Sequence, residues 1–150
     1  MDTAAIIQSI KDRFPGAVAE QTPGWVTINK ENLIDVARFL KDGPSEFSSL
    51  HCLTAVDRKE TVEVVYHFYS FKQRIMLTVK VILPNADLVI DSLTPLWGAA
   101  DWLEREVYDL FGVRFQNHHD LRRIMNPDSW TDHPLRKDFK MAGFIPRPVK

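Results

Sequence analysis

The stretch WLEREVYDLFGVRFQNHHDLRR (102–123) gathers side chains that could take part in acid–base chemistry or bind a metal ion. Carboxylates, arginines and a pair of histidines alternate there with apolar residues. Catalytic sites, metal sites and surfaces that hold another protein all use these residue types, so their spacing has to separate the three. The residues in question are Glu104, Arg105, Glu106, Asp109, His118, His119, Asp120, Arg122 and Arg123.

Glu104 is the first candidate for a catalytic acid. Thr94 followed by Pro95 is a typical helix start, and the apolar spacing that follows predicts a helix over 95–111, ended by Gly112. On this helix Glu104 falls within the apolar arc, whereas Arg105, Asp109 and Trp102 lie on the far side. A carboxylate on a buried stripe is costly unless it is paired or protonated. We expect an arginine, from this chain or a partner, to pair with Glu104. A catalytic acid is the alternative, but no nucleophile stands nearby.

The two adjacent histidines are candidates for metal ligands. In extended backbone, neighbouring side chains point to opposite faces, so His118 and His119 are not expected to share an ion. His133 is 14 residues away from His119, and no thiol is close, whereas a structural zinc site needs about four ligands at set spacings. The sequence therefore predicts no metal site, and histidines that form hydrogen bonds on a contact surface.

The charge distribution favours a protein partner over nucleic acid. The net charge is −1, but residues 1–112 hold 11 Lys and Arg against 16 Asp and Glu, whereas residues 113–150 hold 8 against 4. The basic residues of 113–150 alternate with acids, prolines and aromatic residues, a mixture typical of protein interfaces. No phosphate-binding loop, nucleotide-binding glycine motif or nucleophile elbow occurs in the sequence.

The rest of the sequence predicts a single small α+β domain that positions this stretch. Helical spacing of apolar residues predicts two helices, the second with Asn29 as its N-cap, and alternation predicts the strands. After Gly112 the periodicity ends, so we expect a core domain over 1–112 and an extended, partner-binding tail over 113–150. The predicted helices are 2–13, 30–42 and 95–111, and the predicted strands are 17–21, 25–29, 47–57, 61–71 and 74–83.

The cysteine content and hydropathy limit cofactors and location. Cys52 is the only cysteine, so the sequence has no internal disulfide and cannot hold an iron–sulfur cluster by four thiolates. No apolar run reaches the ~18 residues of a membrane span, and residues 1–14 do not resemble a signal peptide. We expect a soluble, cytoplasmic chain that reaches a membrane only through a partner.

A longer motif within this region resembles a known family. The pattern E-R-E-x2-D-L-F-x6-H-x3-R-x-I-M runs from Glu104 to Met125, and NPDSWTDHPLRKDF (126–139) follows it. These residues resemble the signature of the 30-kDa subunit, also called the C subunit, of respiratory complex I. The segments LIDVARFLKD (33–42) and LHCLTAVD (50–57) are similar to the helix and strand that precede the signature in that family.

The resemblance implies an α+β domain with a mixed or antiparallel sheet and an extended C-terminal segment. It implies membership of the hydrophilic arm of a proton-pumping NADH-quinone oxidoreductase, on the cytoplasmic side of the membrane, with no cofactor in this chain. FMN, iron–sulfur clusters and quinone would be held by partner subunits, and the tail would contact the quinone-site D subunit and the cluster-bearing B subunit. Related subunits occur in membrane-bound hydrogenases and ferredoxin-linked complexes, so the electron donor stays open.

The resulting hypothesis is a structural role without catalytic, cofactor-binding or metal-binding residues in this chain. Two alternatives remain: a free-standing enzyme that uses Glu104 or the histidines, and an RNA-binding module that uses the basic tail. In the isolated chain we expect a tail, from about residue 113 on, that is mobile or held by crystal or oligomer contacts, and an exposed apolar patch where a partner normally lies. Residues predicted to fix the helix end and the tail's exit are Glu104, Arg105, Glu106 and Asp109, and His118 is predicted to form hydrogen bonds on a contact surface. Those predicted to contact partners are Arg122, Arg123, Trp130, Arg136, Lys137 and Phe139.

Overall fold

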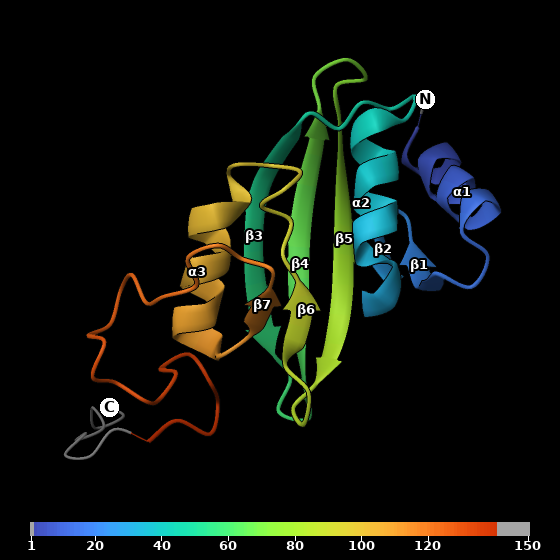
Figure 1. The fold of residues 1–150 in the computed structure, drawn as a ribbon. Coiled ribbons are helices and arrows are strands. Elements are labelled where there is room, and N and C mark those ends of the chain that lie inside the picture. The colour runs from blue at the N-terminus through green and yellow to red at the C-terminus, as the bar shows by residue number, and fades with distance from the viewer. Residues whose placement is uncertain (1, 141–150) are drawn as a thin grey trace, which may run out of the picture.

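The structure, a computed structural model, describes residues 2–140 (Figure 1). Its helices are α1 (Thr3–Arg13), α2 (Leu33–Asp42) and α3 (Ala100–Phe111), with a 3-10 turn over Lys30–Asn32. Its strands are β1 (Val18–Thr22), β2 (Trp25–Ile28), β3 (Ser49–Asp57), β4 (Thr61–Ser70), β5 (Ile75–Pro84), β6 (Val89–Asp91) and β7 (Arg114–Gln116).

Five strands form a mixed sheet in the order β1-β2-β5-β4-β3. The β4–β5 and β3–β4 pairs are antiparallel, as expected for strands joined by short turns, and β2 lies parallel to β5. This confirms the predicted α+β class with a mixed sheet, and the five strands lie within two residues of their predicted bounds.

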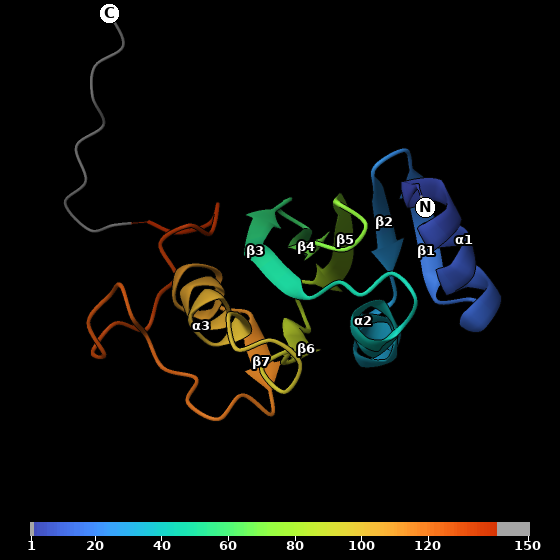
Figure 2. The same ribbon diagram turned by 90° about the horizontal axis from the view of Figure 1, so that it is seen from above.

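The core lies between one face of this sheet and the helices. Alternate residues of β4 and β5 are buried on that face, as Val64 and Val79 show, because a strand turns successive side chains to opposite sides. Leu33 and Leu40 lie on the buried stripe of α2, and Ile6 on that of α1. Figure 2 shows α2 and α3 on the same side of the sheet, so α3 packs against the same face as α2.

A second, two-stranded sheet was not predicted. Strand β6 pairs in parallel with β7, which lies just beyond α3, and Ile90 and Phe115 are buried in the core. Strands of three residues are too short to show an alternating pattern in the sequence. Their pairing also depends on the chain folding back beside β6 after α3, which no local pattern predicts. Val113 is fully buried as well, so the first residues of the predicted tail are packed into the core.

Two helix starts differ from those predicted. Helix α3 begins at Ala100 rather than Pro95, because Leu93–Ala99 forms turns in which Leu93 O accepts from the amides of Leu96 and Trp97. The Thr94 hydroxyl lies 2.7 Å from the Ser92 hydroxyl and caps no helix. Asn29 does not cap α2 either; its side-chain amide donates to Gly16 O at 2.8 Å. A local contact with Ser92 satisfies Thr94 in place of the predicted cap, and a longer-range contact with Gly16 satisfies Asn29.

Beyond β7 the chain follows an irregular path back along α3 to Lys140 (Figure 1). Among residues 2–140, no helix combines the length and hydropathy that crossing a membrane requires.

Candidate functional site

Asp109 is the centre of the contacts between α3 and the tail. Its side chain is fully buried, and its Oδ2 accepts from three consecutive amides, those of Ile124 at 3.1 Å, Met125 at 2.6 Å and Asn126 at 2.9 Å. Its Oδ1 accepts from Arg123 Nη1 at 2.7 Å and Asn126 Nδ2 at 2.9 Å. One carboxylate therefore holds residues 123–126 of the tail against α3.

The protonation of Asp109 follows from these contacts. Burial alone would raise its pKa. The hydrogen bonds from Asn126 and Met125 and the bond from Arg123 outweigh that effect and hold the pKa of Asp109 well below its usual range. The carboxylate is thus an ionised structural group.

The tail also supplies the C-terminal cap of α3. Arg123 Nη1 donates to Asp109 O at 3.1 Å, His133 Nδ1 lies 3.0 Å from the same oxygen, and the Leu135 amide donates to Leu110 O at 3.0 Å. The last carbonyls of a helix have no partner within it, so these contacts satisfy groups that would otherwise be buried unpaired. Asp109 and Arg105 lie on the side of α3 away from its apolar arc, as expected, and the tail covers that side.

Arg105 is buried between the tail and Trp102. Its Nε donates to Arg122 O at 3.2 Å, and its guanidinium lies 4.5 Å from the centre of the Trp102 ring. The side chain of Arg122 itself is exposed and pairs with Asp120 at 3.0 Å. Glu106, one residue after Arg105, is exposed. Of the residues 104–106, the first two are structural and only Glu106 faces solvent.

Glu104 is fully buried, but its partners are not those expected. Ser92 Oγ donates to Glu104 Oε2 at 2.6 Å and the Leu93 amide donates to Oε1 at 2.7 Å, so the predicted arginine is absent from its hydrogen bonds in the described chain. Burial raises the pKa of Glu104 to about 7, and the charge of Asp101 adds to this, whereas the Ser92 and Leu93 hydrogen bonds oppose it. Glu104 thus ties α3 to the turn after β6.

The two adjacent histidines lie on the same side of the backbone. Their rings are stacked at 5.1 Å, and both Nε2 atoms lie 3.3 Å from Asp101, His118 from Oδ1 and His119 from Oδ2. The expectation that extended backbone separates them is therefore wrong, because Asn117, at φ +64°, interrupts the strand. Asp101, His118 and His119 bring three potential ligand atoms within 4.8 Å of one another.

The hydrogen bonds of His118 are unfavourable for metal coordination. Its side chain is fully buried, and Nδ1 accepts from the Asp120 amide at 3.0 Å. The proton of a neutral ring then lies on Nε2, which is 3.1 Å from Asp101 O and can donate to it. A metal ion at Nε2 would need that proton to move to Nδ1, where it would meet the Asp120 N–H. The geometry of Asp101, His118 and His119 therefore fits hydrogen bonds that join α3 to the tail better than it fits a metal site.

The later part of the tail contacts the end of β3. Asp57 Oδ2 accepts from the Lys137 amide at 2.9 Å and lies 3.4 Å from Arg136 Nε. Burial alone would raise the pKa of Asp57, but the backbone hydrogen bonds from Lys137 and Lys59 and the charge of Arg136 lower it. Sequence reasoning missed Asp57; a charged residue that ends an otherwise apolar strand was its only signal.

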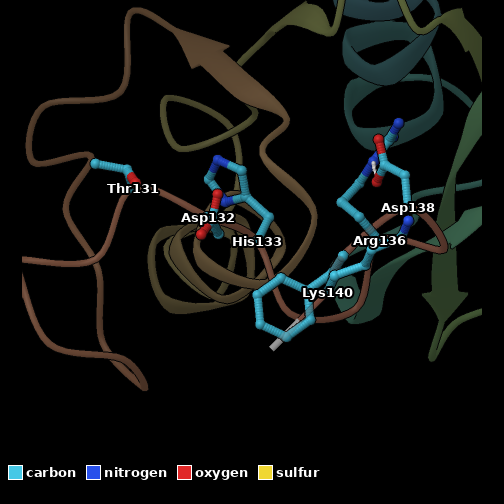
Figure 3. Close-up of a pocket in the computed structure, with 7 residues that line it drawn as sticks. Thr131, Asp132, His133, Arg136, Asp138 and Lys140 are labelled. Atoms are coloured by element: carbon cyan, nitrogen blue, oxygen red, sulfur yellow. Dashed lines mark ion pairs between the residues drawn. The ribbon is translucent and has the colours of Figure 1, made fainter. Parts of the chain in front are cut away.

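Figure 3 shows the hollow that this part of the tail encloses, about 260 Å³ in volume. Arg136 and His133 line it, and both already pair within the chain. The predicted anchors Trp130 and Phe139 stack on each other at 6.4 Å and are half-buried. Of the predicted partner-binding residues, Arg123 and Arg136 pair with the buried Asp109 and Asp57, whereas Arg122, although it pairs with Asp120, and Lys137 present exposed side chains. Contact with another protein stays a prediction for all of them.

Taken together, the described residues of the predicted site form contacts that hold the tail and the turn before α3 against that helix. Glu104, Arg105, Asp109 and His118 each have a hydrogen-bonding partner in the tail or in the turn before α3. Comparison with known proteins identifies the family. Residues 26–144 match the family described as "Respiratory-chain NADH dehydrogenase, 30 Kd subunit". This chain belongs to that family.

Relatives of this 30-kDa family extend over nearly the whole chain. The C subunit of NADH-quinone oxidoreductase from Geobacter sulfurreducens is 43% identical over 149 residues, which cover 94% of this chain and 91% of that protein. The C subunit from Citrifermentans bemidjiense is 40% identical over 151 residues, covering 96% and 93%.

Two solved structures share the fold. A trypsin-resistant fragment of Nqo5 (1–134) superimposes with a TM-score of 0.68 at 28% identity, covering 81% of this chain and 100% of that chain. A chain of the membrane-bound sulfane sulfur reductase, an archaeal respiratory membrane complex, gives a TM-score of 0.75 at 28% identity, covering 93% and 86%. A fold similar to that of this chain therefore also occurs within an archaeal respiratory membrane complex.

Proposed function

We propose that this chain is the C subunit of an NADH-quinone oxidoreductase and that its role there is structural. Its relatives of about 40% identity over nearly the full length carry that name, and this is the observation that carries the proposal. The geometry supports the structural part. The ionisable groups of the family signature fix the path of the tail, so they present a preformed surface to neighbours and have little freedom to act on a substrate.

The finer assignments extend this proposal. The tail contacts the quinone-site D subunit and the cluster-bearing B subunit, while FMN, iron–sulfur clusters and quinone belong to partner subunits. This chain holds no cofactor and no catalytic residue, and it reaches the cytoplasmic side of the membrane only through the complex, which couples electron transfer to proton translocation. The ordered path of residues 117–140 supports the proposed contacts with the D and B subunits, because an ordered surface loses less entropy on binding than a free segment.

The alternatives have weaker support. The likeness to a chain of the sulfane sulfur reductase complex keeps a related hydrogenase or ferredoxin-linked complex as a second candidate, but the relatives of higher identity favour the NADH-linked enzyme. An RNA-binding role would need free cations along the tail, whereas Arg123 and Arg136 pair with Asp109 and Asp57.

Affinity purification of the tagged chain from its native membranes tests the proposal. We expect iron–sulfur and quinone-site subunits to co-purify, and the preparation to oxidise NADH with quinone as acceptor. The same chain purified alone should be inert. Recovery of the chain without other respiratory subunits, or turnover by the isolated chain, would contradict the proposal.

A further inference from the structure

The five-stranded sheet has a second face that the described elements leave open. Along β5, Leu77 and Val79 point into the core, so Met76, Thr78 and Ile82 point the other way. Figure 2 shows α2, α3 and the β6–β7 pair on one side of β3, β4 and β5, and no element of residues 2–140 on the other. A partner could therefore reach this face directly.

Four side chains form a continuous patch at one end of the open face, here called the aromatic patch: His51, Tyr69, Phe71 and Met76. The Tyr69 ring lies 5.1 Å from His51 and 5.0 Å from Phe71, and Tyr69 pairs with Met76 across the β4–β5 ladder. Phe71 is 64% exposed and Met76 47%. A register shift between Leu50 and Cys52 leaves His51 unpaired in the ladder, and its ring lies against this cluster.

The composition of the aromatic patch is that of an interface. Isolated exposed apolar residues are normal on a protein surface, but contiguous aromatic residues and methionine are enriched where proteins meet. His51, Tyr69 and Met76 lie on three paired strands and Phe71 follows directly after β4, so the backbone beneath most of the patch is already ordered before a partner covers it.

The charges around the patch indicate the chemistry of its partner. Lys72 pairs with Glu46, and Lys80 lies 4.0 Å from Glu63. Arg74 is exposed at the β4–β5 turn and forms no ion pair within residues 2–140. The rim of the patch therefore carries one uncompensated positive charge beside an apolar centre.

We infer that the aromatic patch docks a polypeptide segment of another subunit, apolar at its centre and carrying a carboxylate opposite Arg74. This rests on the proposed function, since it requires a complex to join. A protein segment fits better than a membrane or nucleic acid, because those surfaces attract clusters of basic residues rather than a single cation.

Photo-crosslinking in the assembled complex tests the contact. With benzoylphenylalanine at position 71, illumination of native membranes should link this chain to one other subunit, through a peptide that contains Asp or Glu. The same label at Glu20, exposed on the edge strand β1, is the control. Adducts with lipid only, absence of an adduct at position 71, or equal yields of the same adduct at both positions would overturn the inference.

A matched pair of variants tests how much the aromatic patch contributes to holding this chain in the complex. Met76→Ser and Ile82→Ser change side chains on the same face of β5 with 47% and 44% exposure. We expect Met76→Ser to speed dissociation of this chain from salt-washed membranes about fivefold, Arg74→Glu to do at least as much, and Ile82→Ser to have little effect. Thermal unfolding of the isolated variants checks that each still folds.

The outcomes separate this inference from the proposed function. If native chain does not co-purify with respiratory subunits, the proposed function fails and this inference falls with it. If native chain co-purifies but Met76→Ser and Arg74→Glu dissociate no faster than Ile82→Ser, the proposed function stands and the docking inference alone is wrong.

Discussion

At the scale of single residues, Asp109 makes the densest set of structural contacts. Its two oxygens accept five hydrogen bonds, one of them from Arg123, whose side chain is 7% exposed. An acceptor with that many donors cannot be replaced by an amide without placing N–H groups against each other.

We expect Asp109→Asn to lower the free energy of unfolding by about 3–5 kcal/mol, because it leaves the buried Arg123 charge without its partner. Urea unfolding of the isolated chain measures this. Glu106→Gln, an exposed carboxylate on the same helix, is the control and should change stability by less than about 0.5 kcal/mol. Equal effects of the two substitutions would show that Asp109 is not structural.

Glu104 should make stability fall as the pH rises. Its pKa is raised from 4.5 to about 7 by burial, so between these values the folded state keeps a proton that the unfolded state loses. The stabilisation is complete below about pH 4.5 and is lost as the pH rises through about 7. Relative to Glu104→Gln, the native chain should lose about 2–3 kcal/mol of unfolding free energy between about pH 5 and about pH 8.

The measurement is urea unfolding of both chains at the two pH values. If the loss of stability with rising pH is the same in Glu104→Gln, Glu104 does not carry it.

At the scale of elements, the end of α3 and the tail act as one unit. Gly112 has φ +80°, and a Cβ at this position would lie 2.6 Å from His133 Cδ2. Only glycine combines this backbone conformation with the close approach of the tail.

We expect Gly112→Ala to destabilise the chain by about 2–4 kcal/mol, combining backbone strain with displacement of His133. Gly24→Ala is the control, because Gly24 has φ +103° but no atom within 4 Å of its would-be Cβ. It should cost only about 1–2 kcal/mol. If the two variants are equally stable, His133 does not press on the helix end.

Hydrogen exchange can show whether the tail holds its path without a partner. The amides of Ile124, Met125 and Asn126 donate to Asp109, and that of Leu135 to Leu110 O. We expect these four to be protected in the isolated chain and to exchange at least about tenfold faster in Asp109→Asn. Rapid exchange of all four in the native chain would support the mobile tail predicted from sequence.

At the scale of the whole molecule, residues 2–140 form a two-layer domain in which one face of the main sheet is left uncovered and the tail is bound to α3. We expect the purified chain to show no flavin or iron–sulfur absorption and to retain no zinc after gel filtration. Cys52 is its only thiol, and the His118 tautomer opposes coordination at Nε2. Absorption spectra and elemental analysis measure both. Stoichiometric zinc that Asp101→Asn removes would contradict this account of the histidines.

Local patterns in the sequence determined the fold class, the five strands of the main sheet and the position of the signature helix, because periodicity reports which side of an element is buried. The motif 104–139 likewise indicated the family, since its residues are contiguous along the chain. The buried position of Glu104 also followed from helical spacing alone.

The tertiary structure alone decided what these residues contact. Ser92, Leu93 and Asn126 became partners of the signature acids because distant segments meet at α3, and no local pattern encodes such a meeting. The same holds for the burial of Arg105 and Asp109, which lie opposite the apolar arc of α3, and for the sheet face that residues 2–140 leave uncovered. Periodicity indicates which side of each element is buried. Which residues cover that side depends on how distant segments of the chain fold together.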